Sequence, residues 1–457
     1  MLVELYRNYL WCSLVLAARS LGISRLHNNM NIWFAPTNSS HLDKNIVLLR
    51  SLQSHGHQVR IACADEVQDP IDHSPDKIRK SGFTFEMVHA PGFPPGVRLL
   101  WGLIHSGKLK RGFRAFLQSH KPIDAVVFGA DTMIISRTFV RAAVQQGIPT
   151  VLIVDGLVLP NLRQAPRGLL EACRRAKSFV AGCVAWLVLR TGLRGTSGVD
   201  LILTVSKSCA KLLAARCPHQ RVRPVGSPEY DDLAMRVKRE DPSAVARRVR
   251  DRLGLDDRPV VFFAHQPLGL PKAEELRRVA HMAEGARRGG GVLLVKFHPR
   301  GEEYPAEWQK LAESIGLTTK DVRFIRDECT SIECCLLCGI CVTIFSTVAL
   351  EAMICGKPLV AIHYGATPST LPYGQEYGAA YDVYDDEQLE AAVTEILTDD
   401  TTRRRLVEAI GPVLDNELFG LDGRSTERME SEIMELVRER SGDAHKQARS
   451  SGSGPVD

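Results

Sequence analysis

The stretch CVTIFSTVALEAMICGKPLVAIHY, residues 341–364, carries the pattern that decides the fold. A short apolar run is followed by a helix-like segment from Ser346 to Gly356, and Pro358 leads into a second apolar run. Glycine and proline are common just after helix ends, and short apolar runs bounded by such residues are typical of buried strands. The stretch therefore predicts a strand–helix–strand unit, the building block of a parallel sheet covered by helices.

The same alternation of apolar strands and amphipathic helices runs outward from this unit over most of the chain. A chain of 457 residues is too long for one hydrophobic core. The pattern therefore predicts an α/β protein with two doubly wound, Rossmann-like domains that face each other across a cleft. The expected parts are an N-terminal extension at 1–30, a first domain at 31–228, a linker at 229–258, a second domain at 259–410, a helix at 411–440 that packs back across the domains, and a disordered tail at 441–457.

Apolar runs of strand length mark the predicted sheets. In the first domain the predicted strands are Asn31–Pro36, Val59–Ala64, Phe85–His89, Ala125–Phe128 and Thr150–Val154; Leu201–Val205 closes the domain, and Val222–Gly226 leads out of it. In the second domain they are Val260–Ala264, Val292–Phe297, Val322–Ile325, Cys341–Phe345 and Leu359–His363. One long helical stretch is expected at Glu387–Ile410, and a last helix at Thr426–Arg440.

The charge and cysteine content argue against several classes of protein. Lys and Arg exceed Asp and Glu by only five, so the composition predicts no nucleic-acid partner. The twelve cysteines do not have the spacing of a small secreted protein, which predicts reduced thiols and a cytoplasmic location. Cys335, Cys338 and Cys341 are three residues apart, but the last enters an apolar strand. Zinc and iron–sulfur sites normally need four ligands on an adaptable loop, so we predict buried core cysteines and no metal.

Two segments are predicted to touch a membrane surface, and each has a second interpretation. In residues 1–30, the apolar run Leu10–Ala18 lies between two arginines. It is either an interfacial helix or the product of a start codon placed upstream of Met30. The segment Leu169–Arg194 mixes apolar residues with five Arg and Lys. It predicts either a peripheral contact with the inner face of the cytoplasmic membrane or an ordinary packed helix.

Ser346, Thr347 and Glu351 form the strongest candidate ligand site. The two hydroxyls stand where a strand ends and a helix begins, beside unpaired backbone N–H groups and the positive end of the helix dipole. Such a position is suited to phosphate, and Glu351 lies about one turn further on. The alternative is a plain helix cap.

Lys296, His298 and Arg300 form a second candidate in LLVKFHPR, residues 293–300. A strand delivers these side chains to its carboxyl end, where ligands of open α/β sheets bind. Each can donate a charge-assisted hydrogen bond to a diphosphate. The alternative is a surface histidine among solvated charges.

His41 is the candidate catalytic residue of the first domain. It follows the first strand at the start of a helix, and its ordinary pKa lies near working pH, as a general base requires. Asp131 ends the strand in DAVVFGAD, residues 124–131, and would orient the imidazole. The alternative is a polar cluster at the helix start, with Ser39 or Ser40 as its cap.

These motifs resemble the GT-B glycosyltransferase superfamily over about Asn31 to Arg440. The nearest likeness is to the bacterial capsule and cell-envelope branch, which includes CDP-glycerol glycerophosphotransferase-like and sialyltransferase-like enzymes. In that branch a His-Pro motif and a later Ser/Thr motif hold the phosphates of the donor nucleotide, and His298-Pro299 and Ser346-Thr347 match them. The resemblance implies that Glu351 contacts the donor ribose. It also implies that His41 is the catalytic base and Asp131 its partner.

The resemblance implies a metal-independent enzyme without a cofactor. It would move a sugar or polyol phosphate from a nucleotide-activated donor to a hydroxyl of a glycan or lipid-linked acceptor, in surface polysaccharide biosynthesis. Lys296, Arg300 and Gln266 complete the expected donor site. The alternatives are a UDP-N-acetylglucosamine 2-epimerase-like enzyme and a non-catalytic relative that binds nucleotide sugars, because one fold serves several functions.

Overall fold

The computed structural model describes residues 29–36, 39–63, 74–88, 98–131, 134–154, 198–266, 271–298, 303–365 and 371–451. These residues form two compact units. Unit 1 comprises the described residues up to Ile153, residues 198–202 and those from Met429 onward, whereas unit 2 comprises Val154 and Leu203–Arg428. Within the described parts of the chain, no helix is long and apolar enough to span a bilayer.

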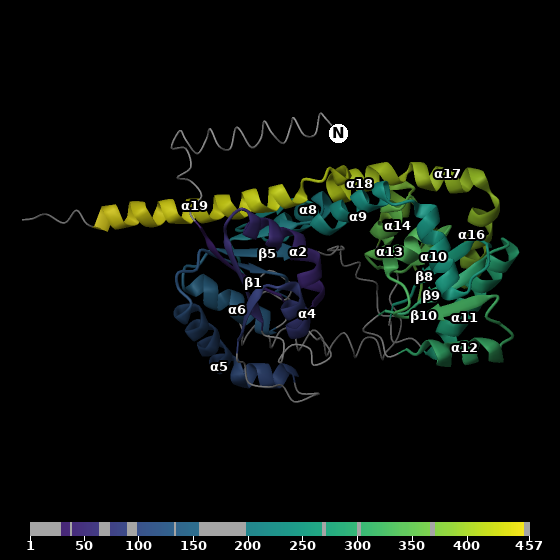
Figure 1. Ribbon diagram of the computed structural model, residues 1–457, viewed down its shortest axis with the longest axis horizontal. Coiled ribbons are helices and arrows are strands. Elements are labelled where there is room, and N and C mark those ends of the chain that lie inside the picture. Colours follow the sequence, from purple (N-terminus) through teal and green to yellow (C-terminus); the bar gives the residue numbers. More distant parts are fainter. Residues whose placement is uncertain are drawn as a thin grey trace, which may run out of the picture. The chain divides into compact units, whose positions relative to one another are not determined.

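The first sheet has seven strands in the order β3-β2-β1-β4-β5-β6-β7. Two of them, β1 and β5, are labelled in Figure 1. The strands are β1 (Asn31–Ala35), β2 (Gln58–Cys63), β3 (Thr84–Met87), β4 (Ala125–Phe128), β5 (Thr150–Val154), β6 (Leu201–Thr204) and β7 (Arg221–Pro224). The helices that connect them include α2 (Ser39–Ser54), α4 (Ser74–Ser81), α5 (Arg98–Ser119), α6 (Ile134–Gln145) and α8 (Lys207–Arg216). β1 runs parallel to both of its neighbours, with Ile32 opposite Val59 and Ala125.

The second sheet has six parallel strands in the order β10-β9-β8-β11-β12-β13. They are β8 (Val260–Ala264), β9 (Val292–Lys296), β10 (Val322–Ile325), β11 (Ile340–Thr343), β12 (Leu359–Ile362) and β13 (Ala380–Val383). Phe262 and Leu294 belong to the apolar cluster on one face, whereas Phe263 and Val295 belong to the cluster on the other. Both faces are therefore buried, which explains the uninterrupted apolar runs in the sequence.

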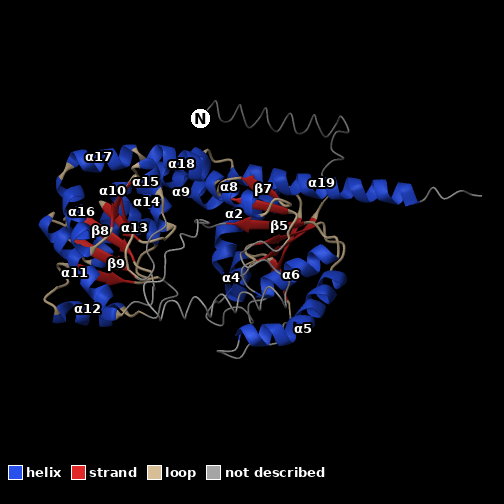
Figure 2. Cartoon of the chain, turned by 180° about the vertical axis from the view of Figure 1, so that it is seen from behind, coloured by secondary structure: helices blue, strands red, loops and turns tan. Residues whose placement is uncertain are grey.

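Helices cover the strands of unit 2, as Figure 2 shows in blue around red. The first two, α9 (Pro228–Arg239) and α10 (Pro242–Leu253), occupy the region predicted as a linker. The others are α11 (Lys272–Arg288), α12 (Pro305–Ser314), α13 (Ser331–Leu337), α14 (Val348–Ile354), α15 (Tyr373–Tyr377), α16 (Asp386–Thr398), α17 (Asp400–Glu408) and α18 (Ile410–Leu418). A short 3-10 turn, Phe419–Leu421, then leads to α19 (Ser425–Ser451), most of which belongs to unit 1.

The two Rossmann-like α/β sheets predicted from the sequence are confirmed, and both have a topological switch point. In the first, the chain leaves β1 toward β2 on one side and returns at β4 on the other; in the second, β8 lies between β9 and β11 in the same way. Ligands of such sheets bind beside the carboxyl ends of the two strands at this point. The cleft between the domains stays a prediction.

Three local predictions were wrong. Strand β13 was missed, because Tyr381 and Asp382 interrupt its apolar pattern. The helical stretch expected from Glu387 to Ile410 is broken at Asp399, which has an extended backbone and whose carboxylate caps α17 by accepting from the N–H of Thr401. The last helix continues past Arg440 to Ser451, where a disordered tail was expected.

Candidate functional site

Three adjacent strands of unit 2 deliver candidate residues to one edge of the sheet. Gln266 follows β8, His298 follows β9 and Ser346 follows β11. Since neighbouring strands lie about 4.8 Å apart, the ends of β9 and β11 are roughly 10 Å apart with β8 between them. Gln266 ties the switch point together, because its Oε1 accepts a hydrogen bond of 2.9 Å from the backbone N–H of Phe345. The loops after β8 and β11 are therefore held in register.

Ser346 and Thr347 play different parts at the start of α14. Ser346 Oγ accepts from the N–H of Val348 at 3.2 Å, so the alternative of a helix cap applies to this hydroxyl. Thr347, the N-cap residue, makes no capping hydrogen bond with its side chain. Its hydroxyl instead contacts Tyr230 of α9. Burial raises the pKa of Tyr230, the nearby Glu351 charge raises it further, and the hydrogen bond with Thr347 opposes them.

The histidine and lysine after β9 have different surroundings. His298 is exposed at the sheet edge. Lys296 is half-buried, and its ammonium donates to the backbone carbonyl of Arg326 in the loop after β10. Burial would raise the pKa of Glu328, but backbone N–H groups and the charge of Lys296 lower it overall. Lys296 is thus engaged by this loop. Arg300 lies outside the described residues, as does the segment Leu169–Arg194.

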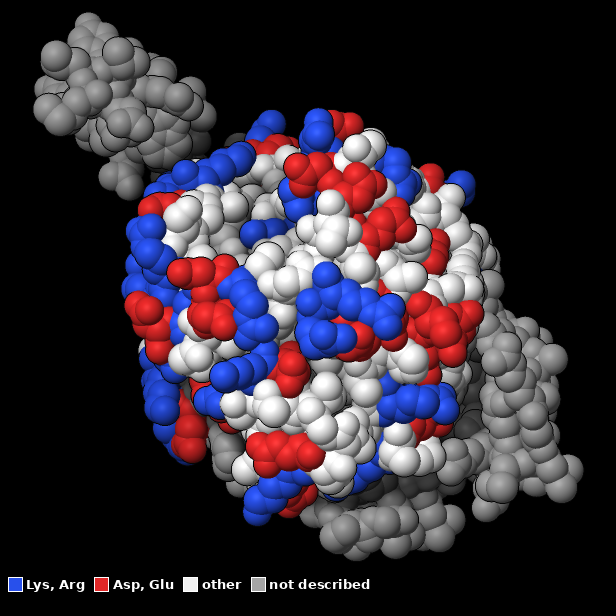
Figure 3. Space-filling view, turned by 90° about the vertical axis from the view of Figure 1, so that its right-hand side faces the viewer, with Lys and Arg blue, Asp and Glu red and all other residues white. Residues whose placement is uncertain are grey.

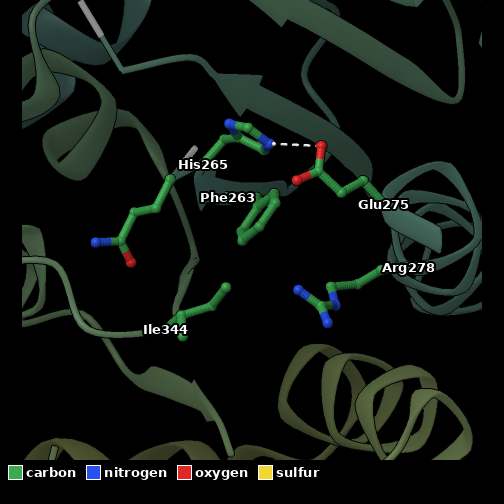
Figure 4. A pocket seen from close by; sticks show the side chains of 6 residues that line it. Phe263, His265, Glu275, Arg278 and Ile344 are labelled. Carbon is green, nitrogen blue, oxygen red and sulfur yellow. Dashed lines mark hydrogen bonds and ion pairs between the residues drawn. The ribbon is translucent and has the colours of Figure 1, made fainter. Parts of the chain in front are cut away.

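A small cavity opens beside the switch point of unit 2 (Figure 4). It is lined by Phe263, His265 and Gln266 from the end of β8, Glu275 and Arg278 from α11, and Ile344 from the end of β11. His265 Nε2 lies 3.4 Å from Glu275 Oε2. Both side chains are almost fully buried, and the guanidinium of Arg278, about one turn after Glu275 in α11, faces the cavity. The space is about the size of one water molecule.

Arg278 is held by the loop after β12. Its guanidinium lies over the ring of Tyr364, 4.8 Å from the ring centre. Tyr364 donates its phenol hydrogen to Asp386 Oδ1 at 2.6 Å, and Arg277 Nε donates to Asp386 Oδ2 at 2.8 Å. Burial and the bond to Asp386 raise the pKa of Tyr364. This chain of contacts fixes Arg278 at the cavity wall.

His41 and Asp131 lie at the switch point of unit 1. His41 is in the first turns of α2, after β1, and Asp131 is buried just after β4. Between them lies Gly129, whose N–H donates to the carbonyl of Ala35 at the end of β1. A Cβ atom at position 129 would lie 2.8 Å from His41 Cβ and 3.2 Å from His41 Nδ1. The imidazole therefore rests directly on the backbone of β4's end, and the structure brings His41 and Asp131 to one edge.

The cysteines of unit 2 form part of its core. Cys334, Cys335, Cys338 and Cys341 are fully buried. Burial raises the pKa of the Cys335 and Cys338 thiols and raises that of Cys355 to about 12. Among the residues that the structure describes, no group of three or more His, Cys, Asp or Glu is arranged to hold a metal.

Sequence reasoning missed four residues that shape these sites: Tyr230, Glu275, Arg278 and Gly129. Tyr230 lies in the predicted linker, and the two α11 residues look like parts of an ordinary charged helix. Only Gly129 had a usable signal, because a glycine at a strand's carboxyl end often marks a close approach.

One family model and several solved structures resemble the chain. Residues 304–410 match the model described as "Glycosyl transferases group 1". The matched range includes Ser346 and Glu351 but not β8 or β9. No curated protein sequence matches the chain significantly. UDP-GlcNAc 2-epimerase from Neisseria meningitidis, bound to UDP-GlcNAc, is 14% identical, with a TM-score of 0.59 over 89% of this chain and 100% of that one.

Two further structures have the same architecture. A glycosyltransferase from Rickettsia africae is 12% identical, with a TM-score of 0.54 over 89% of this chain and 99% of that one. HepE from Anabaena, in complex with UDP-glucose, is 13% identical, with a TM-score of 0.54 over 88% of this chain and 100% of that one. At these identities the likeness establishes the fold, so the prediction of a GT-B architecture is confirmed.

Proposed function

We propose that the chain is a glycosyltransferase that uses a nucleotide-activated sugar or polyol phosphate as donor. The observation that carries the proposal is the convergence of Gln266, His298 and Ser346 at the carboxyl edge of three adjacent strands. A histidine and a helix start at this edge are groups that bind phosphate. The family match over 304–410 and the nucleotide sugars bound in two structures of the same fold support this choice.

The proposed reaction is a direct displacement at the activated carbon or phosphorus. His298, Arg300 and the Ser346–Thr347 turn stabilise the negative charge that develops on the leaving nucleotide. Glu351 holds the ribose, with Tyr230 beside it. His41, oriented by Asp131, takes the proton from the acceptor hydroxyl. No cofactor takes part, and activity is expected to survive EDTA.

The proposed setting is surface polysaccharide synthesis, with a glycan or lipid-linked acceptor at the inner face of the cytoplasmic membrane. The basic segment Leu169–Arg194 is the proposed membrane contact. Sedimentation with vesicles of anionic and of neutral lipid checks it, and equal, negligible binding to both would remove the membrane from the proposal.

The second candidate is a UDP-N-acetylglucosamine 2-epimerase-like activity, favoured by the fold likeness to the Neisseria enzyme. The two candidates share a nucleotide pocket and differ in their product. Incubation with UDP-GlcNAc alone gives the 2-epimer if the chain is an epimerase. A transferase leaves this compound unchanged until an acceptor is added.

A thermal-shift screen tests donor binding. The probes are UDP-, GDP-, CDP-, CMP- and TDP-linked compounds, with His298→Ala as the control variant. A ligand at about a hundred times its Kd should add roughly 2.7 kcal/mol to the free energy of unfolding. We expect one nucleotide class to raise the Tm of the wild type and to lose this effect in the variant. A well-folded protein that none of them stabilises would contradict the proposal.

A further inference from the structure

Arg278 and Glu275 place a buried cation and a buried carboxylate on one cavity. They are three residues apart, on the same side of α11. Their exposed fractions are only 3% and 9%. Glu275 Oε2 is paired with His265, and the ion pairs found among the described residues do not join Glu275 to Arg278. Arg278 Nε is buried without a hydrogen-bond partner in the described structure. Because an unpaired buried polar group is costly, a polar group is expected between the two charges.

The charges around the cavity limit what that group can be. Asp386, which faces Arg278 through Tyr364, is already balanced by Arg277. The acidic and basic side chains that line the cavity are therefore Glu275, which is paired with His265, and Arg278. A phosphate would be repelled by Glu275 and a cation by Arg278. A hydroxyl fits both, since its oxygen accepts from the guanidinium while its hydrogen is donated to the carboxylate.

The position and size of the cavity point to a hydroxyl carried by a ligand. The cavity adjoins the switch point, where ligands of these sheets bind, and its lining includes Gln266, the residue that ties the β8 and β11 loops together. Phe263 and Ile344 supply apolar surface, and the space admits about one oxygen atom. Pockets of this kind use a few polar groups on an apolar floor to fix a ligand's orientation.

We propose that this cavity binds one hydroxyl of the carbohydrate portion of the nucleotide-activated donor, between Arg278 and Glu275. This inference rests on the proposed function and deepens it, because it assigns a specificity pocket to two residues of α11. A site built to hydrogen-bond a hydroxyl rejects an analogue that lacks it, since its buried polar groups are then left unpaired.

Isothermal titration of two variants, Arg278→Met and Glu275→Gln, tests the proposal. The probes are UDP-glucose, GDP-mannose, CDP-glycerol, CMP-N-acetylneuraminate and TDP-glucose, each beside its free nucleotide. Arg287→Met is the matched control, because Arg287 lies on the same helix but is largely exposed and pairs with Glu284. Glu275→Gln nearly preserves the shape of the side chain. It therefore replaces Arg278→Met as the test variant if Arg278→Met melts at a much lower temperature than the wild type.

The expected result is a loss of affinity of about ten- to a hundredfold for the conjugate that binds, with its free nucleotide unchanged within about twofold. This places the hydroxyl on the transferred unit. An equal loss for both probes places the hydroxyl on the ribose if deoxy nucleotides agree. The 2′- or 3′-deoxy nucleotide must then bind the wild type more weakly than the full nucleotide does, and must bind Arg278→Met as well as the full nucleotide does.

Two results would overturn the inference. If both folded variants bind conjugate and nucleotide as the wild type does, the cavity holds only solvent. If they weaken both probes equally, and removal of the 2′- or 3′-hydroxyl lowers affinity for wild type and Arg278→Met by the same factor, the variants act indirectly. A wild-type protein that binds none of the ten probes instead refutes the proposed function, and the inference with it.

Discussion

In unit 1 the space beside the ends of β1 and β4 is filled by the ring of His41, whereas in unit 2 the space beside β8 and β11 is left as a cavity. Both sheets have the same order around their first strand. In unit 1 a glycine lets a side chain settle on the backbone, which fixes one reactive group. In unit 2 His265 turns to Glu275, and Gln266 joins the loops after β8 and β11, beside a small cavity. The same topology thus positions a side chain in one unit and leaves a cavity in the other.

The largest effect is expected for Gly129→Ala, which would break the arrangement in unit 1. The new Cβ would lie 2.8 Å from His41 Cβ, too close for either atom to stay in place. We expect the free energy of unfolding to fall by about 1–3 kcal/mol. We also expect the transfer rate to fall by about a hundredfold or more, because a displaced general base loses its function.

Chemical denaturation and kcat measurements check this prediction. Gly107→Ala in α5 is the matched control, because its Cβ would meet nothing within 4 Å. It should leave both quantities unchanged or raise stability slightly. Wild-type turnover in a folded Gly129→Ala variant would show that the position of His41 does not matter.

The second effect concerns the hydrogen bond between Gln266 and Phe345 in unit 2. Gln266→Ala removes the acceptor for the N–H of Phe345, so we expect a loss of about 1 kcal/mol in stability and about tenfold in nucleotide affinity. Gln266→Glu keeps an acceptor oxygen but adds a negative charge beside the proposed phosphate site. It should preserve stability and still weaken binding. If both variants bind the nucleotide as tightly as the wild type does, Gln266 does not belong to the site.

A smaller effect is expected for Tyr364→Phe at the cavity wall. It deletes the bond to Asp386, at a cost of about 1.5 kcal/mol. Because the pKa of Tyr364 is raised in the folded state, the tyrosine's contribution is fully present below pH 10, the ordinary value. It is lost as pH rises further, since ionisation then favours the unfolded chain.

Urea unfolding between pH 7 and pH 11 measures this difference. The gap between wild type and Tyr364→Phe should stay constant to about pH 10 and then narrow. Tyr384→Phe is the control, because Tyr384 is half exposed and its hydroxyl only accepts from Gln375. A gap that does not change with pH would mean that Tyr364 is not held neutral by its surroundings.

The smallest effect is expected among the exposed charges of unit 2, whose surface carries interspersed basic and acidic groups (Figure 3). Glu284 pairs with Arg287 and Arg288 at 2.7 Å and 2.8 Å. Hydrogen bonds from both lower its pKa to about 2. Glu284→Gln should cost at most about 0.5 kcal/mol and leave ligand binding intact. Because the pKa is lowered, this contribution is present above pH 4.5 and fades as pH falls toward 2, which melting curves in that range would detect.

The sequence was sufficient for the central strands because they are buried on both faces, so that strands such as β8 and β11 read as plain apolar runs. It failed at β13, where the adjacent Tyr381 and Asp382 interrupt the apolar pattern, and at Asp399, where one carboxylate separates two helices. The loop residues His298 and Ser346 were accessible to motif reasoning because each directly follows a strand. Arg278 and Tyr230 were not, since their roles depend on contacts between segments far apart in the chain.

The buried cysteines of unit 2 have a practical consequence. Thiolates, not thiols, react with oxidants and alkylating reagents, and burial keeps these sulfurs both protonated and shielded. Their chemical modification must therefore wait for unit 2 to open. The labelling rate of Cys335 and Cys338 would therefore report how often unit 2 opens, and a bound ligand should lower this rate.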